Sequence, residues 1–431
     1  MNKINQFIES NIDKIILVFL FLNPFLDVFT GLQTHYLNIN FSISSVVRFI
    51  FMIFCIYYIF SLDTTTNKAI NKKFLYLFLI YLILFSITVL RFKGFNAYFY
   101  EIKNTLNTFY FPIVLVSLYD MFNQYKIKIS LKQITTIYFI YVLFIFIPDI
   151  LGIGFISYYH SKLGSVGFFI SANAVGNILS ILMPFIAFYL INSREYKIIN
   201  LILIIILLIV LSDMGTKVPM LSLLIVTIFY LGNYLIEWIK NKQIKKILIT
   251  SIAIIVVTLS SIIMIPKTSF YKNLQIHKKF LGINHYYEVF TDIKLIDHFI
   301  FSQRLTFLSN TNKNFVHSSI LEKMNGIGYI EGYGTDSVST KTIEIDYAEV
   351  FYRQGILGFI LFWYMIIRTL KNIYSGLKEK KLINIEYKIS YLLILLLGLF
   401  SGHIFVTPAV SIFVILIIIR AISYKKFEKN K

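Results

Sequence analysis

The feature of this sequence that most constrains its fold is a series of long apolar runs along nearly the whole chain. Apolar runs of about 18–22 residues are long enough to cross the hydrocarbon core of a bilayer as helices. The sequence therefore predicts an all-α, polytopic integral membrane protein with about 12 transmembrane helices. The expected spans are residues 12–31, 43–62, 73–90, 104–122, 131–151, 168–192, 197–213, 217–237, 246–265, 345–368, 384–402 and 404–422.

The composition of the 431-residue chain argues against a soluble globular protein. Hydrophobic residues make up 57% of the chain and charged residues only 15%, whereas about a quarter of the residues of soluble domains are charged. The net charge of +19 does not indicate nucleic-acid binding, because the Lys and Arg residues lie in short runs between the apolar stretches. We therefore expect the lipid bilayer, and no nucleic acid, as a partner.

The distribution of the cations also predicts the orientation of the spans. Cytoplasmic segments of membrane proteins are enriched in Lys and Arg. With the N-terminus inside, the basic segments 68–73, 240–246, 368–388 and 420–431 all fall on the cytoplasmic side. The sequence thus predicts a multi-pass protein of the cell membrane with both termini in the cytoplasm.

The stretch between the ninth and tenth spans, residues 266–343, is expected to be a large extracytoplasmic loop. A connection of this length in a compact bundle is usually functional. It divides the chain into an N-terminal bundle of about nine helices (1–265), the loop itself, and a C-terminal part (344–431) with about three helices and a basic cytoplasmic tail.

Several cations lie near the outer ends of the expected spans, and one more lies in the loop. A cation within a span costs about 2.5–3.5 kcal/mol on insertion scales, so it usually has a partner or a purpose. Together these cations could form a pocket for a doubly charged diphosphate, to which Arg offers paired hydrogen bonds. The simpler alternative, which we favour for Lys93, is that they snorkel to lipid headgroups. The candidate diphosphate ligands are Arg48, Arg91, Lys217, Arg304 and Arg353.

An acidic cluster, Glu344, Asp346 and Glu349, opens the tenth span. Glu349 and Arg353 are four residues apart on one helical face and could pair. Asp27 in the first span is expected either to pair with an arginine or to cap an irregular turn at Pro24. A carboxylate at the rim of a low-dielectric site can act as a general base. The alternative is that these acids stabilise a helix N-terminus. The loop histidines lack ligand spacing, so we expect no metal site.

Nothing in the sequence has the form of a nucleotide-binding or nucleotide-sugar motif, so an enzyme here would need a donor that reaches it from the lipid. Four stretches point to such an enzyme family. In their order and spacing they resemble the O-antigen ligase/polymerase superfamily, particularly its Gram-positive members, over nearly the whole chain. The stretches are residues 23–31 (NPFLDVFTG), 167–176 followed by Pro184, 211–217 (LSDMGTK), and the long loop with 302–304, 326–328 and 344–358.

The resemblance implies a GT-C-like membrane glycosyltransferase that uses a polyprenyl-diphosphate-linked oligosaccharide as donor and needs neither cofactor nor metal. It implies that the candidate cations, Arg91 excepted, hold the diphosphate leaving group. One of the three carboxylates would then orient or deprotonate the acceptor hydroxyl. A flippase and a chain-length regulator of the same pathway are the protein partners to be expected.

One position departs from the family pattern. Ligases usually have a His eleven residues before the glycine that is Gly355 here, and this chain has Glu344 there. We therefore expect a polymerase that makes a capsule, exopolysaccharide or teichuronic-type polymer. The alternatives are a ligase acting on another acceptor, and a flippase or other transporter of lipid-linked oligosaccharide. A transporter should show two similar halves, whereas this chain has one asymmetric loop.

Overall fold

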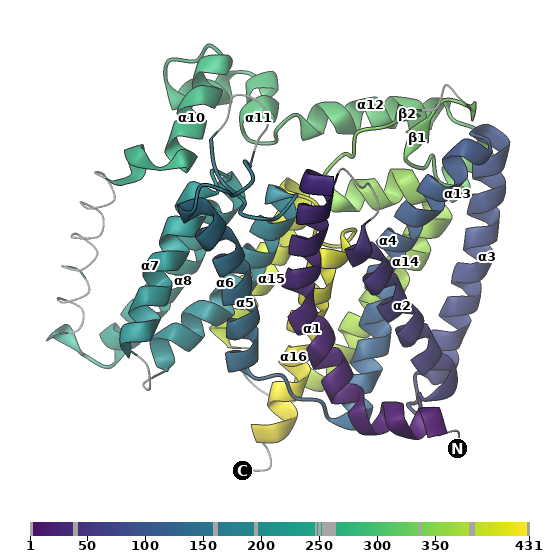
Figure 1. The fold of residues 1–431 in the computed structure, drawn as a ribbon, viewed down its shortest axis with the longest axis horizontal. Helices are drawn as coiled ribbons and strands as arrows, with labels where there is room; N and C mark the ends of the chain where they lie inside the picture. The colour runs from purple at the N-terminus through teal and green to yellow at the C-terminus, as the bar shows by residue number, and fades with distance from the viewer. Residues whose placement is uncertain are drawn as a thin grey trace.

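The computed structural model describes residues 3–37, 42–157, 163–193, 197–245, 248, 251, 264–334, 338–378 and 384–428. A bundle of long helices makes up most of this molecule (Figure 1). The ninth expected span, 246–265, lies almost wholly outside the described residues. The long helices are α1 (Lys3–Leu37), α2 (Ile43–Ser61), α3 (Lys68–Phe92), α4 (Phe95–Tyr125), α5 (Leu131–Ile150), α6 (Ala172–Asn192), α7 (Lys197–Asp213), α8 (Lys217–Lys240), α14 (Asp346–Lys378), α15 (Ile385–Phe400) and α16 (Pro408–Glu428).

Seven helices in the described part of the chain are long and apolar enough to cross a membrane: α1, α2, α3, α5, α6, α8 and the segment Asp346–Ile373 of α14. This confirms an all-helical, multi-span membrane protein. The expected number of about 12 spans is not confirmed. With 17 and 16 residues, α7 and α15 are shorter than the roughly 20 that a span needs. The apolar part of α16 is limited to Pro408–Ala421, and polar residues interrupt α4.

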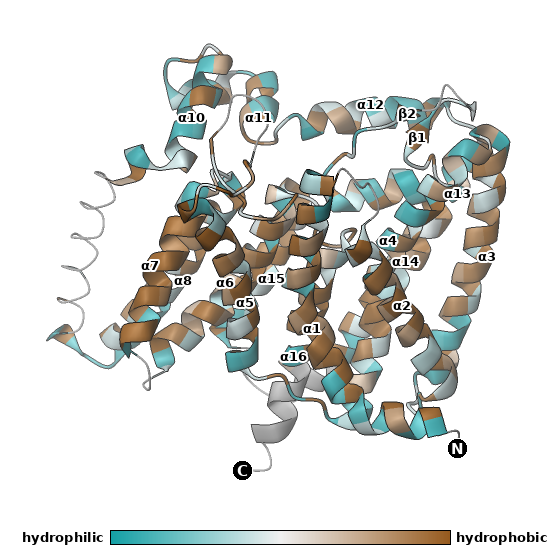
Figure 2. Ribbon diagram, in the orientation of Figure 1, coloured by the Kyte–Doolittle hydropathy of each residue, from teal (hydrophilic) through white to brown (hydrophobic). Residues whose placement is uncertain are grey.

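Short elements connect α8 to α14 and lie across one end of the bundle (Figure 1). We call this end, which carries α10 to α13, the upper end. Figure 2 shows hydrophobic residues along the long helices and hydrophilic residues gathered toward the two ends of the bundle. The short elements are η1 (Ile265–Lys267), α10 (Ser269–Phe280), η2 (Tyr286–Thr291), α11 (Ile293–Phe299), α12 (Arg304–His317), α13 (Ile320–Asn325) and the antiparallel pair β1 (Ile330–Glu331) and β2 (Val338–Ser339).

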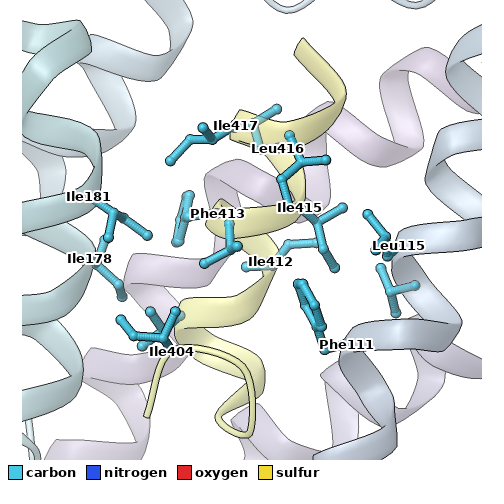
Figure 3. Packing of buried hydrophobic residues seen from close by; sticks show 14 of the residues in the cluster. Phe111, Leu115, Ile178, Ile181, Ile404, Ile412, Phe413, Ile415, Leu416 and Ile417 are labelled. Atoms are coloured by element: carbon cyan, nitrogen blue, oxygen red, sulfur yellow. The ribbon is translucent and has the colours of Figure 1, made fainter. Parts of the chain in front are cut away.

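The core of the bundle is built around α16. Residues 410–421 of this helix are buried without exception, as expected for a helix that is apolar on every side. The apolar part of α16, Pro408–Ala421, therefore packs against protein rather than lipid along its length. Figure 3 shows Ile412, Phe413, Ile415, Leu416 and Ile417 of α16 among Phe111 and Leu115 of α4 and Ile178 and Ile181 of α6.

Helix α14 is broken at Gly355, whose backbone angles (φ 66°, ψ −175°) are not helical. A side chain at this position would meet the backbone of Asn325 at 2.7 Å, so the approach of α13 requires glycine. The break leaves the backbone carbonyls of Tyr352 and Arg353 without hydrogen-bond partners inside the helix. The carbonyl of Tyr352 accepts the N–H of Ile327 (3.1 Å), and that of Arg353 accepts the N–H of Gly328 (3.2 Å). The glycine-rich segment after α13 is thereby bonded onto α14.

Candidate active site

A polar cavity of about 210 Å³ lies between α4, the residues that lead into α14, and the connection from α15 to α16. The acidic residues singled out in the sequence, Glu344, Asp346 and Glu349, all line it. The structure thus brings the acidic cluster together with polar residues of α4, from a distant part of the sequence. The lining residues are Tyr100, Asn104, Asn107, Thr108, Tyr329, Thr340, Thr342, Glu344, Asp346, Glu349, His403, Val406, Thr407 and Pro408.

Asp346 uses both carboxylate oxygens on the backbone of the α15–α16 connection. Oδ1 accepts the N–H of His403 at 2.7 Å, and Oδ2 accepts those of Ile404 (2.7 Å) and Phe405 (2.8 Å). His403 has a φ of 62°, a left-handed conformation that is uncommon for a residue other than glycine. The carboxylate therefore holds a tight turn in place. Asp346 anchors one wall of the cavity, and its oxygens are already engaged.

We expect Asp346→Ala to destabilise the protein by at least about 3 kcal/mol, because it removes the acceptor of three backbone N–H groups and each buried unsatisfied group costs about 1–3 kcal/mol. Thermal unfolding of the purified protein in detergent measures this loss. Asp292 is a matched control: its carboxylate also accepts a backbone N–H (Lys294, 2.9 Å) but at an exposed site. Asp292→Ala should cost about 1 kcal/mol. Equal effects of the two substitutions would contradict the anchoring role.

Glu349 has one carboxylate oxygen bonded to protein and one without a donor. Oε2 accepts the N–H of Ile343 at 2.7 Å. Oε1 has no hydrogen-bond partner among the described residues, and the Nε of Arg353 lies 3.5 Å from it. The expected pairing of Glu349 with Arg353 is thus confirmed. Because a buried oxygen without a donor is rare, Glu349 is the lining carboxylate best placed to accept a proton from a ligand.

The guanidinium of Arg353 ties the loop residues to α14. Its Nη1 donates to the carbonyl of Gly328 at 2.8 Å and its Nη2 to that of Lys341 at 3.0 Å, while Nε faces Glu349. Two of its three nitrogens are therefore bonded to backbone carbonyls. This arrangement favours a role in holding the cavity wall. Binding of a diphosphate by Arg353 stays a prediction.

Arg304 pairs with Glu344, the third acidic residue. Its Nη2 lies 2.6 Å from Glu344 Oε2 and 3.3 Å from the carbonyl of Ser401, and its Nη1 donates to the carbonyl of Phe301 at 3.2 Å. The Nε atom of Arg304 is buried and has no hydrogen-bond partner in the part of the chain that the structure describes. A donor in this state is suited to an anion that enters beside the cavity.

Lys217 and Arg304 both contact the turn between α11 and α12. The Nζ atom of Lys217 donates to the carbonyl of Phe299 and lies 3.4 Å from Nδ1 of His277. Arg304 donates to the carbonyl of Phe301, two residues further on. Both candidate cations therefore donate to backbone carbonyls at the turn that joins α11 to α12.

The remaining candidate cations lie elsewhere. The Nη2 of Arg48 lies 2.6 Å from Oδ1 of Asp27 and 3.0 Å from Oδ1 of Asn23, which confirms the expected pairing of Asp27 with an arginine. Asp27 lines a second cavity of about 170 Å³. Arg91 is exposed and lies over the ring of Phe92. The structure therefore does not gather the five candidates around one cavity.

Sequence reasoning missed a buried ion pair beside the cavity. Glu101 of α4 is fully buried and pairs with Lys93, which was expected to snorkel. Its carboxylate also accepts the N–H groups of Tyr329 and Ile330 at 2.8 Å. The hydroxyl of Tyr329, which lines the cavity, bonds to Thr108 at 2.9 Å. The available signal was that Glu101 is the only acid between Asp63 and Asp120.

The fold and the cavity define the class of this protein: a multi-span helical membrane protein with a carboxylate-lined cavity at its upper end. The family model of O-antigen ligase like membrane proteins matches residues 9–288 and 284–427, and the chain belongs to this family. This confirms the resemblance seen in the sequence. Membership implies, in general terms, a glycan-transferring role in the ligation or polymerisation of lipid-linked glycans. No curated protein and no solved structure matches the chain.

Proposed function

We propose that the protein polymerises polyprenyl-diphosphate-linked oligosaccharide repeat units into a cell-surface polysaccharide on the outer face of the membrane. The observation that carries this proposal is Glu349, a buried carboxylate in the cavity wall whose Oε1 accepts no hydrogen bond from the described residues and has only the ion-pair contact with Nε of Arg353 at 3.5 Å. Glycosyl transfer needs such a base for the acceptor hydroxyl. In this proposal the upper end faces outward, and both termini are cytoplasmic.

The reaction would proceed as a single displacement. The oxygen of an acceptor sugar hydroxyl attacks the anomeric carbon of the donor glycan while its proton passes to Oε1 of Glu349. The bond from the anomeric carbon to the phosphate oxygen breaks, and the polyprenyl diphosphate leaves with the electron pair. Attack from the face opposite the leaving group inverts the anomeric carbon.

Arg304 and Lys217 would stabilise the leaving diphosphate. They converge on the turn between α11 and α12, and Arg304 also contacts Glu344 in the cavity wall. Cations that are already in place where negative charge develops lower the barrier without reorganisation. The unpartnered Nε of Arg304 offers one donor to a phosphate oxygen.

The polymerase is favoured over a ligase because Glu344 stands where ligases usually have a His. The carboxylate of Glu344 forms an ion pair with Arg304 at 2.6 Å, and this pairing stabilises its charged form. In this proposal Glu349, and not Glu344, therefore accepts the proton. A ligase acting on another acceptor would use the same cavity and the same base. A flippase would need no base at all.

Reconstitution with purified protein and extracted lipid-linked repeat units tests this function. We expect a ladder of longer lipid-linked glycans and release of polyprenyl diphosphate, without added nucleotide sugar and in the presence of EDTA, because the donor carries its own leaving group. Mass spectrometry and gel electrophoresis of the products measure this. A strict requirement for a nucleotide sugar, or movement of the intact lipid-linked glycan across vesicles without any bond exchange, would contradict the proposal. Transfer only to a non-lipid acceptor would indicate a ligase.

A further inference from the structure

One face of α4 presents a stripe of polar side chains to the cavity. Tyr100, Asn104, Asn107 and Thr108 all line it, and their spacing of four, three and one residues places them on one side of a helix. Polar residues inside a helical membrane bundle usually face a substrate path or a partner. We therefore expect these polar side chains to contact a ligand in the cavity.

The two asparagines of this stripe have no partners for their side chains. Asn104 and Asn107 are half-buried, and no hydrogen bond of either amide is found within the described part of the chain. The buried asparagines elsewhere behave differently: Asn177 donates to the carbonyl of Gly402 at 2.8 Å, and Asn325 to Thr88 at 2.8 Å. Each free amide offers two donors and one acceptor oxygen. Such a pair matches the hydroxyl groups of a sugar.

The opposite wall of the cavity carries hydroxyls and acids. Thr340 and Thr342 line it together with the three carboxylates, and no Lys or Arg is among the described lining residues. Burial lowers the pKa of His403. The nearby carboxylate of Glu344 raises this pKa and the guanidinium of Arg304 lowers it, with a net decrease that favours the neutral imidazole. Glu344 and Glu349 are already paired with Arg304 and Arg353. A carboxylate or phosphate on the sugar ring would therefore lose its hydration in this cavity without gaining a lining cation as a partner, which disfavours its binding.

We propose that Asn104 and Asn107 form the subsite for the acceptor sugar, and that this subsite takes one uncharged sugar ring and rejects uronate or phosphorylated rings. The inference rests on the proposed function, in which Glu349 of the same cavity takes the proton of the acceptor hydroxyl. Asn104 and Asn107 would hold the ring by hydrogen bonds to neighbouring hydroxyls, and Tyr100 at the exposed rim would cover one face of it.

Binding of simple glycosides to the purified full-length protein tests the subsite. The probes are methyl glycosides of glucose, galactose, N-acetylglucosamine and N-acetylgalactosamine, compared with those of glucuronic and galacturonic acid, and the readout is saturation-transfer NMR with titration. We expect at least one neutral probe to bind and neither uronide to do so. Asn104→Ala and Asn107→Ala should each weaken the neutral probe about tenfold, as loss of one hydrogen bond predicts.

Two further variants sharpen the test. Asn123 lies at the other end of α4, and its amide donates to the carbonyl of Tyr119 at 2.9 Å, so Asn123→Ala should leave binding unchanged. Asn107→Lys places an ammonium group in the cavity and should admit a uronide. Uronides that bind the unaltered protein as well as neutral probes, or unchanged binding in both alanine variants, would overturn the proposal, as would binding of no probe at all.

The outcome is separable from that of the proposed function. If neutral probes bind through Asn104 and Asn107 but reconstitution shows no glycan transfer, the subsite stands and the polymerase proposal fails. If transfer occurs while the two alanine variants keep the KM for the acceptor, the polymerase stands and the subsite fails. If both proposals are right, these variants should raise the KM about tenfold and change kcat much less.

Discussion

Glu349→Gln is expected to lower the rate of glycan transfer about 10²- to 10⁴-fold, the range that a positioned general base contributes. Glutamine has nearly the shape of glutamate and keeps an oxygen that can accept the N–H of Ile343, now 2.7 Å from Oε2. What it loses is the capacity to take the proton of the acceptor hydroxyl. Polymer formation in cells and transfer by the purified variant measure the change.

A matched control for this substitution lies on α15. Glu386 is also a buried carboxylate with one oxygen that has no hydrogen-bond partner among the described residues. It stands at the start of α15, whereas the end of that helix leads to the cavity. Glu386→Gln should therefore leave transfer near the original rate. If Glu349→Gln kept more than half of the activity, Glu349 would not be the base.

The long helices were predictable because their signals are local. The expected span 43–62 is observed as Ile43–Ser61, where the side chain of Ser42 accepts the N–H of Ser45 at the helix start and an apolar run follows. Helix α4 was harder, because Asn104 and Asn107 look like interruptions of an apolar run. In the folded bundle they line a cavity. A single sequence does not distinguish a polar residue that ends a span from one that faces an internal site.

The acidic residues of the site were predictable, but their separate roles were not. The cluster at 344–349 was found because three acids open an apolar run. Which of them is engaged depends on contacts with distant segments: the 403–405 backbone occupies Asp346, and Arg304 occupies Glu344. Such contacts arise only when the loop and α15–α16 fold against α14. For the same reason the sequence could identify the candidate cations, but it could not show that they lie in different parts of the structure rather than around one pocket.

The ion pair of Lys93 with Glu101 shows how the cavity wall is held. Besides Lys93, the carboxylate of Glu101 accepts the backbone N–H groups of Tyr329 and Ile330. The ammonium group of Lys93 also donates to the carbonyl of Ile327 at 2.5 Å. One buried pair therefore fixes residues 327–330, which carry Tyr329 into the cavity, against α4.

Replacing Glu101 by Ala should destabilise the protein by about 3–5 kcal/mol, the usual effect of removing one member of a buried ion pair, because the charge of Lys93 is left uncompensated. Thermal unfolding in detergent would measure it. Glu101→Gln keeps one acceptor oxygen, which can take the place of the Oε1 that accepts the N–H groups of Tyr329 and Ile330, and should lose less. Adding Lys93→Met to Glu101→Ala should restore part of the stability, since no unpaired charge then remains. If the double variant were less stable than Glu101→Ala, the unpaired ammonium would not be the cause of the loss.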